Sequence, residues 1–367
     1  MSKRTISRRT LLKKAVATTA VLAAPAAWAQ QKEDQVILYG TTGGIVEEVQ
    51  RKTIFDPFTA ATGIKVVSVS YPKLAKVEAM VSTNTVDLDF WEIGASDIGI
   101  LGRRNLLEPI DYAKLRSGLK DDLITNGALQ YGVGTIVWGA GIVYSATEFQ
   151  EGSHPRSWAD VWDVSKFPGP RALPDPSYYV GPIEAALIAD GVPVDKLYPL
   201  DVDRAFASLD KIKPHIAKFW STSPEGLNLM ASGNAVVGMN TLGRIIVMKQ
   251  QGQDPGINIE FNQAMAKISY WGMPKKAPHP KNFHRLLDYY LEPKNHAAFL
   301  NAYPAYGLTV KSAQPYMDPA TAANRINSPE HLANLIMIND DWWMEEDSSG
   351  RSNFEKVNER WASWVSQ

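Results

Sequence analysis

The sequence predicts an α/β protein built from two lobes, and three observations lead there. Segments typical of strands and of helices alternate along nearly the whole chain, which predicts parallel sheets with helices on both faces. The chain has 367 residues, more than one hydrophobic core usually organises, so two lobes are expected. A glycine-rich stretch over residues 132–144 interrupts the pattern and marks the expected crossing between the lobes.

The composition is that of an ordinary globular protein. Apolar residues make up 45% of the chain, and 38 basic residues nearly balance 39 acidic ones, which excludes a disordered chain. Outside the N-terminal segment there is no basic cluster, so no nucleic-acid partner is expected. The chain has no cysteine, which excludes disulfides, thiolate metal sites and cysteine nucleophiles.

The N-terminal segment resembles a bacterial twin-arginine signal. Its residues 7–13 read Ser-Arg-Arg-Thr-Leu-Leu-Lys, a weakly apolar stretch follows, and residues 27–29 read Ala-Trp-Ala. This is the order of charged region, apolar region and small-residue cleavage site. We therefore expect residues 1–29 to be a signal peptide read by the Tat translocase, and the mature protein to be periplasmic. An uncleaved anchor or an ordinary Sec signal is the alternative.

The first lobe is expected to begin with strands at residues 36–39, 64–71 and 88–93. A helix should follow the first strand, with Asp56-Pro57 acting as N-cap and first helical residue after a kink. Gly63 is placed as its C-terminal cap. Residues 73–83 read as the next helix.

The rest of the chain repeats the alternation and then becomes helical. Two apolar segments, 135–138 and 142–144, are expected to be separate strands of the crossing. A second α/β unit should follow, with strand 235–239 and a return strand at 268–273. Helices are expected at 203–213, 225–231, 242–251, 282–291, 295–302, 329–338 and 354–365.

Several motifs resemble periplasmic solute-binding proteins of ABC importers, in particular the spermidine/putrescine-binding branch. The motifs are Ile54-Phe55-Asp56-Pro57-Phe58, Trp138-Gly139, the segments 157–162 and 167–173, the segment 197–206, and Tyr303-Pro304-Ala305-Tyr306-Gly307. The resemblance implies the two-lobed type II periplasmic binding protein fold, with a two-strand hinge and a ligand cleft between the lobes. It places lobe 1 at 30–138 plus 268–312 and lobe 2 at 139–267 plus 313–367. It also implies a monomer without cofactor or metal that delivers a small molecule to an inner-membrane ABC permease.

Loops at the carboxyl ends of the expected strands are the candidates for the ligand site, because such loops line the crevice of an open α/β sheet. The candidate residues are Thr42, Gly43, Gly44, Ser96, Asp175, Tyr178, Tyr179, Thr241, Arg244, Ser269, Tyr270 and Trp271.

Each candidate has a functional and a purely structural interpretation. The Thr42-Gly43-Gly44 turn offers backbone N–H groups to an anion, or only caps its own helix. Arg244 offers a two-pronged donor to a carboxylate or phosphate, or is a solvated surface residue. The four aromatic candidates could hold an ammonium group or simply pack in the core. Asp175 could bind an amine or close an Asx turn.

The nature of the ligand stays open between several classes. The resemblance implies polyamine transport, yet polyamine binders have Trp-Asn-Gly where this chain reads Thr241-Leu242-Gly243, and Trp-x-Asp where it reads Lys267-Ile268-Ser269. A carboxylate-bearing or zwitterionic solute, iron and a phosphonate are the alternatives. An exported enzyme is a more remote one, because the sequence lacks nucleophile-elbow, Walker and dinucleotide-binding motifs.

Overall fold

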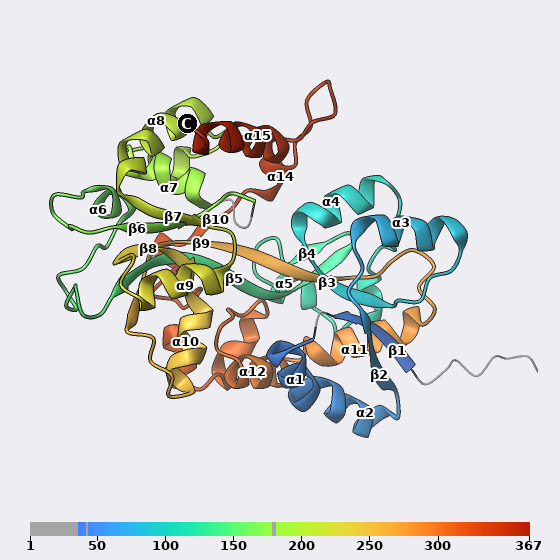
Figure 1. Ribbon diagram of the computed structural model, residues 1–367. Coiled ribbons are helices and arrows are strands. Elements are labelled where there is room, and N and C mark those ends of the chain that lie inside the picture. The colour runs from blue at the N-terminus through green and yellow to red at the C-terminus, as the bar shows by residue number, and fades with distance from the viewer. Residues whose placement is uncertain (1–35, 42, 178–180) are drawn as a thin grey trace, which may run out of the picture. The chain divides into compact units, whose positions relative to one another are not determined.

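A single ten-stranded sheet organises the computed structural model, which describes residues 36–41, 43–177 and 181–367 (Figure 1). Along the main path the strands lie in the order β2-β1-β3-β9-β5-β8-β6-β7, with β10 beside β9 and β4 beside β5. The strands are β1 (Val36–Thr41), β2 (Lys65–Ser70), β3 (Phe90–Gly94), β4 (Ala128–Leu129), β5 (Gly132–Ser145), β6 (Arg171–Pro174), β7 (Ile216–Trp220), β8 (Val237–Thr241), β9 (Ile257–Gly272) and β10 (Ile336–Met337).

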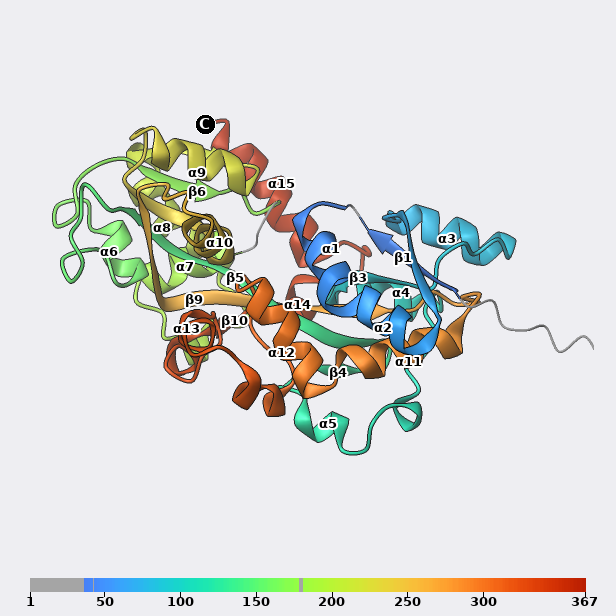
Figure 2. The same cartoon turned by 90° about the horizontal axis from the view of Figure 1, so that it is seen from below.

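The sheet is parallel at its two ends and antiparallel in the middle. β1 pairs in parallel with β2 and β3, and β6 pairs in parallel with β7 and β8. Between these ends, β5 and β9 form a long antiparallel pair that crosses from one group of helices to the other (Figure 2). The predicted parallel sheet therefore exists twice, and the antiparallel pair joins the two halves.

β5 is one continuous strand, so the prediction of two separate strands at 135–138 and 142–144 was wrong. Its internal glycines allow close packing and do not end the strand. A Cβ atom on Gly139 would lie 2.1 Å from the carbonyl oxygen of Met265 on β9. The register between β5 and β9 shifts between Gly134 and Ile136 and again between Ala140 and Ile142. Such irregularities bend a strand where it passes between two packing environments.

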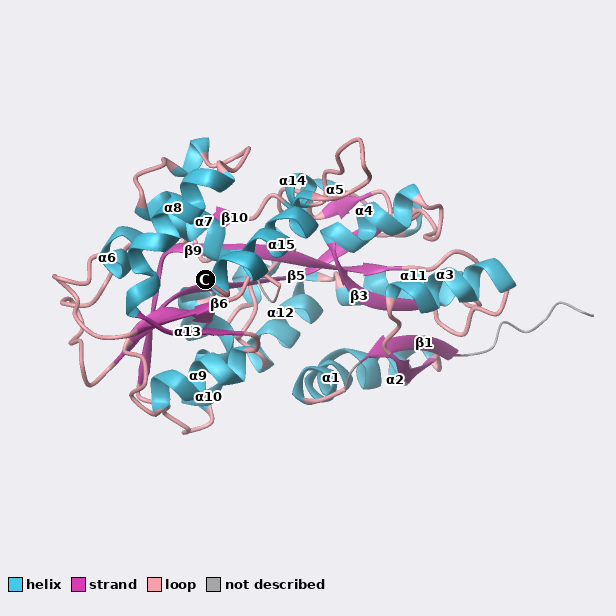
Figure 3. Ribbon diagram, turned by 45° about the horizontal axis from the view of Figure 1, so that its top comes forward, coloured by secondary structure: helices cyan, strands magenta, loops and turns pink. Residues whose placement is uncertain are grey.

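Helices surround the strands (Figure 3). The longest amphipathic ones follow the predicted pattern closely, because a strong 3.6-residue period is the most reliable local signal. The α-helices are α1 (Ile45–Gln50), α2 (Asp56–Thr62), α3 (Leu74–Thr83), α4 (Ala95–Arg103), α5 (Leu119–Asp122), α6 (Trp158–Trp162), α7 (Gly181–Ala189), α8 (Val202–Ile212), α9 (Ser223–Ala231), α10 (Leu242–Gln250), α11 (Pro280–Tyr290), α12 (Pro293–Ala302), α13 (Pro319–Asn324), α14 (Asp340–Trp343) and α15 (Asn353–Val365).

The first helical region does not restart at Asp56. A π-helical segment (Arg51–Phe55) joins α1 to α2, so the residue before Asp56 is already helical and Asp56 does not act as an N-cap. Pro57 is still accommodated in the first turn of α2. Gly63 ends the helix in the left-handed conformation, with φ 75°, as predicted.

The predicted helix at residues 329–338 was wrong. A short 3₁₀ turn (Leu332–Asn334) is followed by β10, whose Ile336 pairs with Met265 of β9. Short apolar runs are ambiguous between helix and strand. Here the strand is favoured, because pairing with β9 satisfies backbone hydrogen-bonding groups and buries Ile336.

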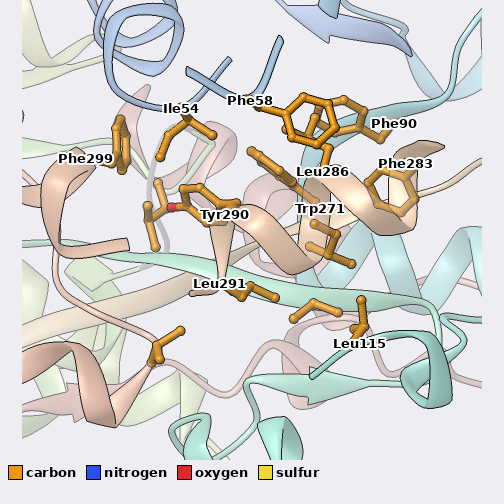
Figure 4. Packing of buried hydrophobic residues seen from close by; sticks show 14 of the residues in the cluster. Ile54, Phe58, Phe90, Leu115, Trp271, Phe283, Leu286, Tyr290, Leu291 and Phe299 are labelled. Atoms are coloured by element: carbon orange, nitrogen blue, oxygen red, sulfur yellow. The ribbon is translucent and has the colours of Figure 1, made fainter. Parts of the chain in front are cut away.

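Three clusters of buried side chains pack against the sheet. One combines residues 37–136 with residues 271–317, a second combines 140–239 with the C-terminal helices, and a third draws on both halves of the sheet. Figure 4 shows the first cluster, in which Phe90, Trp271 and Tyr290 lie together, with ring centroids 4.7 Å and 4.6 Å apart in succession. The shared third cluster makes the two halves one compact unit, and the exact lobe boundaries stay a prediction.

Within the described ranges, no helix is both long and apolar enough to cross a membrane.

Candidate ligand-binding site

Two adjoining cavities lie where the two halves of the sheet meet. Their volumes are about 380 Å³ and 240 Å³, and both are lined by Glu92, Trp138, Ser269 and Tyr306. These residues come from β3, β5, β9 and the segment after α12. That segment also joins the sheet, because Gly307 and Val137 exchange backbone hydrogen bonds of 2.7 Å and 3.0 Å. We call the combined space the junction pocket.

Glu92 is the acidic group common to both cavities. It is the middle residue of β3 and pairs with Trp271 of β9. Burial raises the pKa of the Glu92 carboxyl to about 7, although hydrogen bonding from the side chain of Ser269 acts in the opposite direction. No cation of the described chain lies within ion-pair distance of this carboxylate. The pocket therefore holds an acid that lacks a protein counter-charge.

Arg244 supplies the opposite charge at the other end of the pocket. It is the third residue of α10, and its side chain is exposed toward the smaller cavity. The guanidinium is close enough to Tyr303 and Tyr306 to oppose the rise that burial causes in their pKa values. Arg244 forms no ion pair with the residues that the structure describes. Gly243 lets α10 approach this region, because a Cβ atom there would lie 2.2 Å from the carbonyl oxygen of Ala305.

The other charges of the junction pocket are neutralised within the protein. Glu47 of α1 pairs with Arg51 at 2.9 Å. Burial alone would raise the pKa of Glu47, but hydrogen bonds from Ser68 and Arg51 bring it below its usual value. Lys267 of β9 pairs with Asp340 at 2.6 Å.

Aromatic side chains form much of the pocket wall. Tyr39 lies on one side, with its hydroxyl donating to the side-chain oxygen of Gln50 at 3.0 Å. Tyr303 and Tyr306 lie near Arg244, with ring centroids 5.1 Å apart. Trp138 of β5 borders both cavities. Faces of such rings attract cationic groups and also cover the methylene chain of a small ligand.

The structure brings four of the sequence-predicted residues to the junction pocket. Gly43 lines the larger cavity, Thr241 and Arg244 line the smaller one, and Ser269 lines both. Gly44 is exposed at the start of α1 and does not line either cavity. The N–H of Gly43 donates to the Thr41 hydroxyl at 2.9 Å, and two glutamates occupy the first turn of α1. This helix start is therefore poorly suited to an anion. Thr42, Tyr178 and Tyr179 lie outside the described residues.

The remaining candidates do not reach the junction pocket. Tyr270 is 2% exposed, and its hydroxyl donates to the carbonyl of Asn126 in the core. Trp271 is fully buried in the core against Phe90 and Tyr290. Asp175 accepts hydrogen bonds from Ser177 and from Ser221, in the manner of an Asx turn. Ser96 donates to Asp340 at 2.9 Å and lines a separate cavity of about 740 Å³ beside α14.

Sequence reasoning missed Glu92, which lay inside a segment assigned only as a buried strand. The available signal was a single charged residue in an otherwise apolar run, Phe90-Trp91-Glu92-Ile93, because a charge in a buried strand calls for a partner or a function. No set of three or more histidine or acidic side chains arranged to hold a metal ion occurs in the described part of the chain.

A sheet of two parallel halves, joined by an antiparallel pair beside a charged pocket, defines a two-lobed binding protein. The comparisons agree. The family model for bacterial extracellular solute-binding proteins matches residues 53–327. The chain is therefore a member of the family of bacterial extracellular solute-binding proteins, which bind solutes and are not enzymes.

Individual relatives extend this match over most of the chain. The chain is 28% identical to a gamma-aminobutyric acid-binding protein of Pseudomonas aeruginosa over 92% of its own length and 93% of the relative. It is 23% identical to the spermidine/putrescine-binding periplasmic protein of Escherichia coli K12 over 76% of both chains. A crystal structure of an ABC transporter protein from Rhodopseudomonas palustris shares 33% identity and a TM-score of 0.74, covering 89% of this chain and 98% of that one. The predicted two-lobed binding-protein fold is thus confirmed.

Proposed function

We propose that the protein is the solute-binding component of an ABC importer and that its ligand is a small zwitterion of the 4-aminobutyrate type. The carrying observation is the charge pattern of the junction pocket. Glu92 and Arg244 are opposite charges that form no ion pair with the described residues, while Glu47 and Lys267 are each neutralised by a neighbour. Such a pocket is complementary to one ammonium group and one carboxylate on the same molecule.

Glu92 and Arg244 would each bind one end of the ligand. The ammonium group would sit against Glu92 and the faces of Tyr39 and Trp138, where its charge compensates the desolvated carboxylate. The ligand carboxylate would lie against Arg244, whose planar guanidinium can donate two parallel hydrogen bonds. The start of α10 adds a favourable helix dipole to the same end.

The relatives support this choice of ligand class. The gamma-aminobutyric acid-binding protein of Pseudomonas aeruginosa matches a larger share of this chain, at higher identity, than the spermidine/putrescine-binding protein does. A polyamine remains the second candidate, because Glu92 and the aromatic wall suit an ammonium group at one end. Arg244 argues against it, since a second ammonium would face an unpaired cation.

A phosphonate or ferric ion fits the pocket less well. The carboxylate of Glu92 would repel a phosphonate dianion. A ferric ion requires a cluster of oxygen ligands, and the described residues offer no acidic or histidine cluster of that kind.

Closure of the two halves on the ligand would complete the site. β5 and β9 are the natural hinge, because both run through the junction pocket and their register shifts there. We further propose a periplasmic monomer that delivers its ligand to an inner-membrane permease.

Arg244→Ala tests the ligand assignment. Removing an arginine that binds a buried carboxylate typically costs about 2–5 kcal/mol, roughly a 30- to several-thousand-fold loss of affinity. We expect titration calorimetry to detect 4-aminobutyrate binding to the wild type and almost none to Arg244→Ala, at an unchanged melting temperature. Lys249→Ala, on the exposed last turn of the same helix, is the control. Micromolar putrescine binding that survives Arg244→Ala would support the polyamine alternative.

Export is tested separately in the N-terminal segment. Replacing Arg8 and Arg9 with lysine should retain precursor in the cytoplasm, because paired guanidinium groups are the recognised feature of a twin-arginine signal. Fractionation and immunoblotting measure the effect. Full periplasmic yield from the double variant would argue for a Sec signal instead.

A further inference from the structure

Lys267 brings a second cation into the junction pocket. Its side chain lines the larger cavity together with Glu92 and Ser269, and it is only 18% exposed. A free lysine there would add positive charge to the end of the pocket that holds the acid. It would compete with a ligand ammonium group for Glu92.

Asp340 removes that charge. Its Oδ1 atom lies 2.6 Å from Nζ of Lys267, and the side chain is only 11% exposed. The same oxygen accepts a hydrogen bond from the hydroxyl of Ser96, at the start of α4, at 2.9 Å. Asp340 comes from α14, more than seventy positions after Lys267 in the chain, so only tertiary packing brings the two together. A short, shielded pair of this kind is screened much less than a surface pair.

α14 is itself fixed in place from the second half of the sheet. The indole nitrogen of Trp343 donates to the buried Glu184 of α7 at 2.8 Å, and the backbone N–H of Asn339 donates to the Tyr198 hydroxyl at 3.2 Å. The carboxylate of Asp340 is therefore held at a fixed position toward β9. Asp97 in the first turn of α4 lies near the same pair. Burial has the largest effect on the pKa of the Asp97 carboxyl and raises it overall, while the charge of Lys267 lowers this pKa and the charge of Asp340 raises it.

We propose that Asp340 is a specificity-determining residue that acts through Lys267. By neutralising Lys267, it keeps the acidic end of the junction pocket able to accept an ammonium group, and so selects an amino acid over a dicarboxylate. Asp340 does not touch the ligand in this scheme; it is a positioning residue. The inference rests on the proposed function, since it refines the ligand class of the same pocket.

The test compares two probes, 4-aminobutyrate and glutarate, by titration calorimetry. Asp340→Asn keeps the size of the side chain and an oxygen for Ser96, but removes the carboxylate that pairs with Lys267. We expect 4-aminobutyrate affinity to fall about tenfold and glutarate affinity to rise about tenfold. The reason is that the Lys267 ammonium would then repel the ammonium group of 4-aminobutyrate and attract the second carboxylate of glutarate. Asp341→Asn is the matched control, because Asp341 is the exposed neighbour on α14.

A double variant separates charge from structure. Lys267→Met combined with Asp340→Asn removes both charges, so the preference for 4-aminobutyrate should return even though the ion pair is absent. If Asp340 were merely structural, Asp340→Asn and the double variant would both bind both probes more weakly than the wild type, and this result would overturn the inference. An unchanged ratio of the two affinities in a folded Asp340→Asn protein would overturn it as well.

The outcome for the wild type distinguishes this inference from the proposed function. Wild-type protein that binds 4-aminobutyrate, with an unchanged ratio in Asp340→Asn, overturns only the role of Asp340. Wild-type protein that binds neither probe overturns the proposed function, and the inference falls with it.

Discussion

Two glutamates of this protein have a raised carboxyl pKa, but they lie in different surroundings. Glu92 lies in the middle of β3 and lines the junction pocket, and Glu184 lies on α7 in the second half of the molecule. Burial raises the pKa of each carboxyl to about 7. Glu92 is partly exposed to the pocket, whereas Glu184 is completely buried.

The partners of the two carboxylates differ. Oε1 of Glu184 accepts hydrogen bonds from the Tyr198 hydroxyl at 2.6 Å and from the indole of Trp343 at 2.8 Å. Its Oε2 atom is buried without a hydrogen-bond partner in the described structure, which favours the protonated form. Glu184 thus ties α7 to the C-terminal segment, whereas Glu92 offers its charge to the pocket.

A raised carboxyl pKa alone therefore does not mark a binding site. Perturbed carboxyls occur at structural and at functional positions alike. The difference lies in access to a cavity, because Glu92 lines the junction pocket and Glu184 is enclosed by the core. Four predictions test these two roles.

The largest expected effect is on ligand affinity. Glu92→Gln removes the charge that would face the ammonium group, and we expect 4-aminobutyrate affinity to fall about 30-fold or more. Glu184→Gln should leave affinity within about twofold, because it lies outside the junction pocket. Titration calorimetry on both variants measures the contrast. Equal losses in the two would mean that the pocket is not where the ligand binds.

The next prediction concerns the free energy of unfolding, for which Glu184 should matter more than Glu92. Glu184→Ala leaves the donors of Tyr198 and Trp343 without their acceptor and opens a void, so we expect the free energy of unfolding to fall by about 2–4 kcal/mol. Glu92→Ala should cost less than about 1 kcal/mol, because solvent can enter the pocket. Urea unfolding without ligand provides both values. A larger loss for Glu92→Ala would reverse the assignment of roles.

The smallest effect is on proton linkage. Each glutamate has a folded-state pKa near 7, above the unfolded value of about 4.5, so the folded state holds its proton more tightly. Stability should therefore decrease as pH rises from about 4.5 through about 7. Either glutamine variant should flatten this decrease. Thermal unfolding between pH 5 and pH 8 measures the slope.

Ligand binding should release a proton from Glu92 but not from Glu184. An ammonium group favours ionised Glu92, so affinity should fall about tenfold for each pH unit below 7. Calorimetry at pH 6.5 in buffers of different ionisation enthalpy should detect proton release in the wild type and in Glu184→Gln. Proton release that disappears in Glu184→Gln would contradict the comparison.

Local sequence patterns were enough to predict the α/β class, the helices of strong period, the terminal cap at Gly63 and the position of the glycine-rich crossing, although not its single continuous strand. These follow from local periodicity and from backbone preferences, which depend on near neighbours in the chain. Arg244, Thr241 and Ser269 were also predictable as lining residues, because strand ends in α/β sheets converge on one crevice.

Other features depend on packing between segments that are far apart in the chain. The sequence placed Tyr270 and Trp271 among the ligand candidates, but the pleat and the packing of β9 bury both. Local pattern favoured a helix at 329–338, but an open position beside β9 made part of it a strand. The charged side chains that line the junction pocket come from distant positions in the chain and include Glu92, Arg244 and Lys267. Lys267 pairs with Asp340, which lies outside the pocket. Which of them are neutralised depends on contacts between segments far apart in the chain, and no local pattern encodes such contacts.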